Sequence, residues 1–107
     1  MPVDVDTAKI YRIVPQRVDP VAARAQQHWD FADEQGRVFM RAEIYEGVEQ
    51  WGVRVHDREP SLGDEEILRL IARLLVWHAP CPTDTVDVVL GRTHAHHTLV
   101  KVGADFV

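Results

Sequence analysis

The chain has 107 residues, one cysteine, and 17 acidic against 12 basic side chains, which leaves a formal net charge of −5. This length fits one domain, the single cysteine excludes an internal disulfide, and the acidic balance argues against binding to plain DNA or RNA. The acidic N-terminus is unlike a signal peptide, and no apolar run approaches the roughly 20 residues of a membrane helix. We therefore expect one cytoplasmic domain over residues 1–107, with no nucleic-acid or membrane partner.

The first elements expected along the chain are a strand and a short helix. Residues 9–14 alternate apolar and polar side chains and end at Pro15, which is typical of an edge strand. Asp19 followed by Pro20 combines a helix-capping side chain with the residue favoured at the first helical position. Residues 21–27 are therefore predicted to form a short helix.

Three runs with apolar side chains at every second position follow, a period that is typical of half-buried strands. These runs are residues 29–32, 37–45 and 50–56. A turn around Gln35-Gly36 and a two-residue turn at Glu46-Gly47, with a positive φ at Gly47, would join them as an antiparallel meander. The cross-strand pairs expected on its apolar face are Trp29–Ala42, Phe31–Met40, Ala42–Trp51, Met40–Val53 and Val38–Val55.

A long helix and a terminal hairpin complete the expected fold. Residues 64–78 carry apolar side chains at helical spacing, and Pro80 and Pro82 end that helix. Residues 86–90 and 98–102 alternate like two further strands. The predicted fold class is α+β, a single domain with a mainly antiparallel sheet (the three-stranded meander, a C-terminal hairpin and an N-terminal strand) covered by one long and one short helix. The side chains of all three tryptophans are expected in the core, namely Trp29, Trp51 and Trp77.

The outward face of the meander is the leading candidate for a binding surface. Phe39 is expected opposite Arg54, and Arg37 opposite His56, so aromatic side chains alternate with arginines there. Such mixtures are enriched at protein–protein contacts, although a solvated sheet face is the plainer interpretation. The predicted function is a small, acidic, non-enzymatic protein-binding module of the inhibitor, immunity or adaptor type, or a homodimer. Its predicted binding residues are Arg37, Phe39, Arg41, Tyr45 and Arg54.

A histidine cluster in the C-terminal hairpin supports an alternative prediction. His94 and His96 would share one side of a strand, where two imidazoles can chelate a divalent metal such as Zn²⁺. His97 follows directly, but the sequence identifies no third ligand. The alternatives are a metal-binding protein that uses this hairpin and a polar loop that binds nothing.

The sequence contains no recognisable catalytic motif, so an enzyme is the less favoured class. Cys81 follows the long helix, where the negative end of the helix dipole disfavours a thiolate, and Ser61 is placed to cap the start of that helix. An enzyme or small-ligand protein would need an apolar pocket between the long helix and the sheet.

Overall fold

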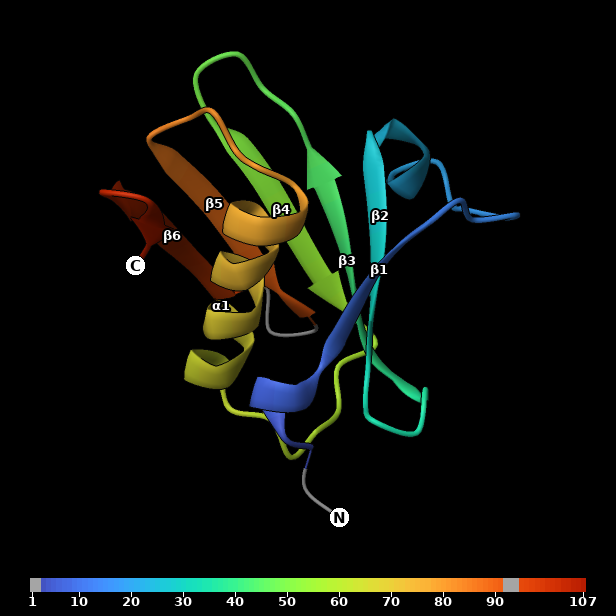
Figure 1. Ribbon diagram of the computed structural model, residues 1–107. Coiled ribbons are helices and arrows are strands. Elements are labelled where there is room, and N and C mark those ends of the chain that lie inside the picture. Colours follow the sequence, from blue (N-terminus) through green and yellow to red (C-terminus); the bar gives the residue numbers. More distant parts are fainter. Residues whose placement is uncertain (1–2, 92–94) are drawn as a thin grey trace.

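The computed structural model describes residues 3–91 and 95–107 (Figure 1). Within these residues, seven strands form one sheet whose spatial order is the same as their order in the chain. Neighbouring strands are antiparallel except β4 and β5, which are parallel, so the sheet is mixed. It curls as a half-barrel around a 15-residue helix (Figure 1). The elements are η1 (Val5–Thr7), β1 (Lys9–Ile13), η2 (Ala22–Arg24), β2 (Gln27–Ala32), β3 (Val38–Tyr45), β4 (Trp51–His56), α1 (Asp64–Arg73), η3 (Leu74–His78), β5 (Thr85–Leu90), β6 (Ala95–Val102) and β7 (Asp105–Phe106).

The expected architecture, a mainly antiparallel sheet under one long and one short helix, is wrong. The chain does combine a sheet with helical segments, but β4 pairs with β5 in parallel, with Val53 opposite Val88. The helix formed by α1 and η3 connects these two strands, and a parallel pair requires a crossover of this kind. The helix expected over residues 21–27 is a single 3₁₀ turn, because Gln26 already donates its backbone N–H to the carbonyl of Ile44 in β3.

The register of the first predicted hairpin is confirmed, and the register of the second is wrong by four residues. Trp29 lies opposite Ala42 in the β2–β3 pair, as expected. Ala42 lies opposite Val55 rather than Trp51, because residues 46–50 form a loop instead of a two-residue turn. A shift of four residues preserves which side chains face the core, since side chains alternate with a period of two.

A β-bulge in β3 changes the faces expected for Val38 and Phe39. Two consecutive residues of β2 pair with Met40 and Val38, so Phe39 is an extra residue between them. Phe39 turns into the core, where it is 3% exposed, whereas Val38 is 40% exposed. The sequence pattern predicted Phe39 on the outward face opposite Arg54, and this is wrong, because Arg54 lies opposite Glu43.

The apolar stripe of the helix packs against the inner face of the sheet. Its side chains belong to the same buried cluster as the inward side chains of β3, β4 and β5. Burial of one large aliphatic side chain stabilises the folded state by about 1.5–3 kcal/mol relative to leaving it exposed. These buried side chains therefore hold the helix on the sheet. No helix in the described part of the chain is long and apolar enough to cross a bilayer. The buried helix residues are Ile67, Leu70, Ile71, Leu74 and Leu75.

We expect Gly47→Ala to lower the free energy of unfolding by about 1–3 kcal/mol, since a Cβ atom at this position would overlap the backbone carbonyl oxygen of Gln50. Gly47 lacks the positive φ expected from the sequence, so it is the close approach of Gln50 that requires glycine here. Gly52→Ala is the matched control, because its nearest neighbours lie at ordinary contact distance, and it should change stability by less than about 0.5 kcal/mol. Urea denaturation measures both values, and a Gly47→Ala variant as stable as the parent would contradict the loop geometry.

Candidate functional site

The structure brings together three of the five predicted binding residues. Arg41 and Tyr45 of β3 and Arg54 of β4 project from the sheet face opposite α1, which we call the outward face. Arg37 lies in the connection between β2 and β3, and Phe39 belongs to the core. The expected row of alternating aromatic and arginine side chains is therefore not formed.

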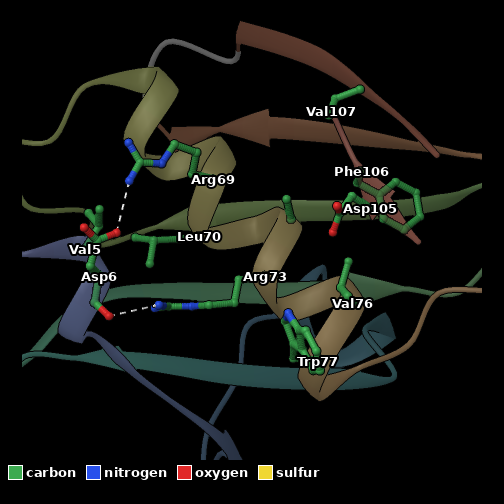
Figure 2. A pocket seen from close by; sticks show the side chains of 11 residues that line it. Val5, Asp6, Arg69, Leu70, Arg73, Val76, Trp77, Asp105, Phe106 and Val107 are labelled. Atoms are coloured by element: carbon green, nitrogen blue, oxygen red, sulfur yellow. Dashed lines mark hydrogen bonds and ion pairs between the residues drawn. The ribbon is translucent and has the colours of Figure 1, made fainter. Parts of the chain in front are cut away.

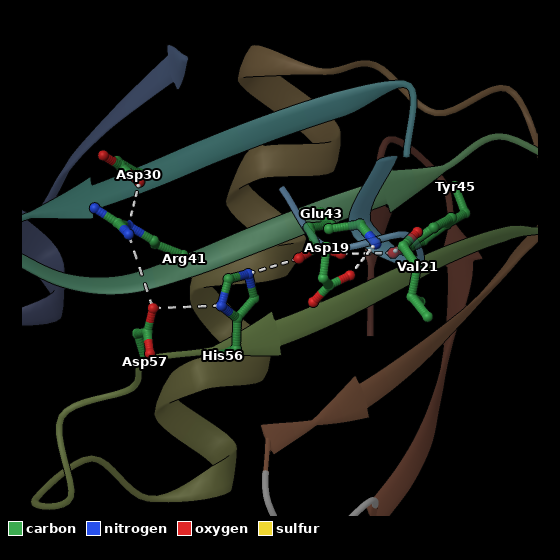
Figure 3. Close-up of polar contacts among 9 residues, drawn as sticks. Asp19, Val21, Asp30, Arg41, Glu43, Tyr45, His56 and Asp57 are labelled. Atoms are coloured by element: carbon green, nitrogen blue, oxygen red, sulfur yellow. Dashed lines mark hydrogen bonds and ion pairs between the residues drawn. The ribbon is translucent and has the colours of Figure 1, made fainter. Parts of the chain in front are cut away.

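A chain of polar contacts crosses the outward face from β2 to β4 (Figure 3). Arg41 Nε is 3.1 Å from Asp30 Oδ1, and Arg41 Nη1 is 3.8 Å from Asp57 Oδ2. The same Asp57 oxygen is 3.4 Å from His56 Nδ1. Asp57 has a φ of 54°, a conformation that costs a residue with a side chain about 1 kcal/mol or more. The surrounding contacts therefore hold Asp57 in an unfavourable backbone conformation at the end of β4.

Glu43 is the buried centre of this network, with only 4% of its surface exposed. Its Oε1 atom lies 2.8 Å from His56 Nε2, and its Oε2 atom accepts a hydrogen bond of 2.5 Å from the Tyr45 hydroxyl. Burial and these interactions with Glu43 raise the pKa of Tyr45 to about 12. The Tyr45 oxygen also lies 3.3 Å from the carbonyl oxygen of Val21, which fastens the segment between β1 and β2 to the sheet.

This network holds charges in place and is poorly suited to moving protons. Both ring nitrogens of His56 face carboxylate oxygens of the protein, so neither is presented to a substrate as a general base. Tyr45 keeps its proton at neutral pH and, with its pKa raised from 10.0 to about 12, well into the alkaline range. The carboxylates of this network thus already have partners within the protein.

A groove of about 380 Å³ lies beside the helix, between α1, η1 and β7 (Figure 2). Trp77 of η3 forms one edge of it and is 76% exposed, whereas Trp29 and Trp51 are each 6% exposed. Tryptophan is enriched among the residues that dominate binding between proteins. The other apolar side chains that line the groove are Val5, Leu70, Ala72, Val76, Phe106 and Val107.

Two arginines of α1 fasten η1 along this groove (Figure 2). Arg69 Nη2 is 3.2 Å from Asp6 Oδ1 in an exposed ion pair. Arg73 donates hydrogen bonds to the backbone carbonyls of Asp6, at 3.4 Å, and Ala8, at 3.1 Å. Asp105 lines the groove from β7, so two acidic and two basic side chains balance along its walls.

The sequence pattern placed Trp77 in the core, and this is wrong because the helix widens before it ends. Trp77 flanks the apolar stripe that helical spacing predicts, and it was therefore expected in the core. From Leu74 onward the helix is π-helical, and the N–H of Ala79 donates to the carbonyl of Leu74, five residues back, at 2.7 Å. The wider turn leaves Trp77 in solvent and brings His78 against Trp29, with ring centroids 6.1 Å apart.

The predicted metal ligands lie only partly within the described residues, because His94 is outside them. His96 projects from β6 with Nδ1 3.3 Å from Asp87 Oδ2, and His97 Nε2 is 3.7 Å from Asp64 Oδ2. Consecutive strand residues point to opposite faces, so these two histidines are directed apart. In the part of the chain that the structure describes, no group of three His, Cys, Asp or Glu side chains is arranged to hold a metal. The divalent-metal alternative stays a prediction.

Two features are therefore candidates for a functional site, the outward face around Glu43 and the groove beside Trp77. Sequence reasoning missed the central residue of each one. Glu43 was one of many acidic residues with no sign of burial, and Trp77 was assigned to the core. Comparisons with protein-family models, with curated proteins and with solved structures find no match to this chain.

Proposed function

We propose that this protein is a non-enzymatic binding module that docks an apolar segment of a partner protein in the groove beside Trp77. The observation that carries the proposal is the 76% exposure of this tryptophan at the edge of an apolar groove. Covering a tryptophan removes a large apolar surface from water, and this makes it an effective anchor. The π-helical turn that exposes Trp77 is also a feature found frequently at functional sites.

The lining of the groove favours a segment without net charge. The two arginines and two aspartates along its walls balance one another, so the groove offers no excess charge for an acidic or basic partner. Between them, Leu70, Val76 and Phe106 supply apolar surface. A segment with one or two large apolar side chains could cover Trp77 and this surface without leaving a buried charge unpaired.

The outward face predicted from the sequence is the weaker docking surface. Its charged groups already have partners within the protein, Arg41 at Asp30 and Glu43 at the His56 ring. A partner would have to compete with these contacts, and the anchor expected at Phe39 is buried. The outward face therefore serves as the comparison surface in the test.

We expect Trp77→Ala to weaken partner binding about 30-fold, which corresponds to about 2 kcal/mol for an interface anchor. The variant should keep the stability of the parent within about 0.5 kcal/mol, because the side chain is exposed. Partners are captured from the cytoplasm of the native host, since the free Cys81 thiol suits a reducing compartment. The captured protein is then purified, and calorimetry with parent and variant gives the two Kd values.

Two further variants make this test specific. Val48→Ala removes a side chain that is 99% exposed in the loop between β3 and β4, and it should leave the Kd unchanged. Tyr45→Ala reports on the outward face, so a Kd that changes with Tyr45→Ala and not with Trp77→Ala would contradict the proposal.

Light scattering over a range of concentrations detects a dimer of the parent. A dimer that Trp77→Ala abolishes would identify a second copy of the chain as the occupant and overturn the assignment to another protein.

A further inference from the structure

A smaller cavity of about 180 Å³ lies on the outward face, under the segment that joins β1 to β2. Figure 3 shows Asp19, Glu43 and His56 gathered on this face, with the helix behind the sheet. The cavity is smaller than the roughly 300–1,000 Å³ of pockets for drug-sized molecules, so it suits a small ligand. The polar side chains that line it are Arg17, Asp19, His28, Arg41, Glu43 and His56.

The acidic side chains of this cavity are already committed to donors within the protein. Glu43 receives contacts from His56 and Tyr45, one on each of its oxygens. Asp19 Oδ1 accepts a hydrogen bond of 2.6 Å from the backbone N–H of Ala22, the first residue of η2. This bond is the main reason why the pKa of Asp19 lies below its usual value. The Asp19 carboxylate therefore stays ionised and bound to the backbone.

The donors of the cavity, by contrast, exceed what the protein uses. Within residues 3–91 and 95–107, the side chains of Arg17 and His28 make no hydrogen bond or ion pair. Arg41 directs Nε and Nη1 toward two aspartates, and its Nη2 has no partner in the same part of the chain. A guanidinium has five N–H donors and no acceptor, so the cavity has a surplus of donors.

We infer that this cavity binds a small oxyanion, a carboxylate or a phosphate group, between Arg17 and His28. Groups of this kind only accept hydrogen bonds, and a guanidinium can bind either of them in a bidentate manner. Glu43 and Asp19 oppose such a ligand less than free carboxylates would, since both oxygens of Glu43 face donors of the protein and Asp19 Oδ1 accepts from a backbone N–H. The site is separate from the groove beside Trp77 and does not depend on the partner proposed for that groove.

The test is a titration with sodium phosphate and, separately, with sodium acetate, with sodium chloride keeping the ionic strength constant. NMR signals of the His28 ring and of the backbone amides around the cavity report binding. We expect a saturable shift with at least one anion, and the anion that saturates at the lower concentration identifies the preferred chemistry. Arg17→Ala should weaken this binding about tenfold or more, because it removes a charge-assisted contact.

Arg24→Ala is the matched control, because it removes the same charge from η2 at a residue outside the cavity lining. It should leave the titration close to that of the parent. The inference is overturned if neither anion gives a saturable shift. It is also overturned if Arg17→Ala titrates like the parent, or if Arg24→Ala weakens binding as much as Arg17→Ala, since the effect would then be general charge screening. Both arginines are exposed, so both variants are expected to fold.

Discussion

Phe39→Ala is expected to lower the free energy of unfolding by about 3–5 kcal/mol, the range measured for loss of large aromatic side chains from protein cores. Phe39 is 3% exposed and belongs to the main buried cluster. It lies at the bulge of β3, and its carbonyl accepts a hydrogen bond of 2.8 Å from the backbone N–H of Glu59. This bond fixes the backbone at the bulge, so neighbouring groups have limited freedom to fill the cavity that the substitution leaves. Urea denaturation followed by circular dichroism measures the loss.

Val38→Ala is the matched control for this prediction. Val38 precedes Phe39 in β3 and is 40% exposed, so its truncation should cost less than about 1 kcal/mol. The uninterrupted alternation of the sequence predicts the opposite order, with a buried Val38 and an exposed Phe39. A larger loss for Val38→Ala than for Phe39→Ala would show that β3 has no bulge and would restore Phe39 to the outward face.

Glu43→Gln should lower the free energy of unfolding by about 2–3 kcal/mol, although it changes only one atom. The carboxylate accepts from two donors, whereas an amide has one acceptor atom and turns its NH₂ group toward either His56 or Tyr45. A buried donor without an acceptor costs about 1–3 kcal/mol, so this rearrangement destabilises the folded state. Urea denaturation gives the stability of the variant, and Glu49→Gln, in the exposed loop before β4, is the control with the same change of charge.

The ionisation of Tyr45 provides a second readout of the same variant. Burial and Glu43 raise its pKa from 10.0 to about 12, so the folded state favours the protonated phenol. This contribution to stability is complete below pH 10 and is lost as the pH rises from 10 toward 12. In Glu43→Gln the pKa should fall while staying above 10, because burial remains, and the alkaline loss of stability should be smaller. Absorbance of tyrosinate measures the shift, and an unchanged Tyr45 pKa would show that Glu43 is not its partner.

The fold was predictable from the sequence wherever a local pattern decides it. Alternation in β2 correctly paired Trp29 with Ala42, and helical spacing correctly identified the buried stripe on α1. The bulge at Phe39 leaves no local sign, because an extra residue changes only the faces of its neighbours. The parallel pairing of β5 could not be predicted, since Val86 and Val88 flank the polar Asp87 just as residues of an antiparallel strand do.

The candidate sites were less predictable than the fold, because both depend on contacts distant in sequence. Arg41, Tyr45 and Arg54 were correctly placed on one face, but the burial of Glu43 depends on the segment around Val21 folding over that face. Exposure of Trp77 depends on a π-helical turn whose residues are all compatible with an ordinary helix. Periodicity assumes a constant pitch, and so it assigns a residue beyond such a turn to the wrong side.

The order of the strands also bears on how the chain acquires its structure. Strands β1 to β4 are neighbours both along the chain and in the sheet, and so are β5 to β7, so most pairings close short loops at a small entropic cost. The parallel pair of β4 and β5 differs, since it forms only when the whole crossover through α1 and η3 has been traversed. Two locally assembled sections of sheet are thus joined through the helix that carries Trp77. Closing this crossover has the largest loop-closure entropy cost of any pairing in the sheet, and the same crossover presents Trp77, the proposed anchor.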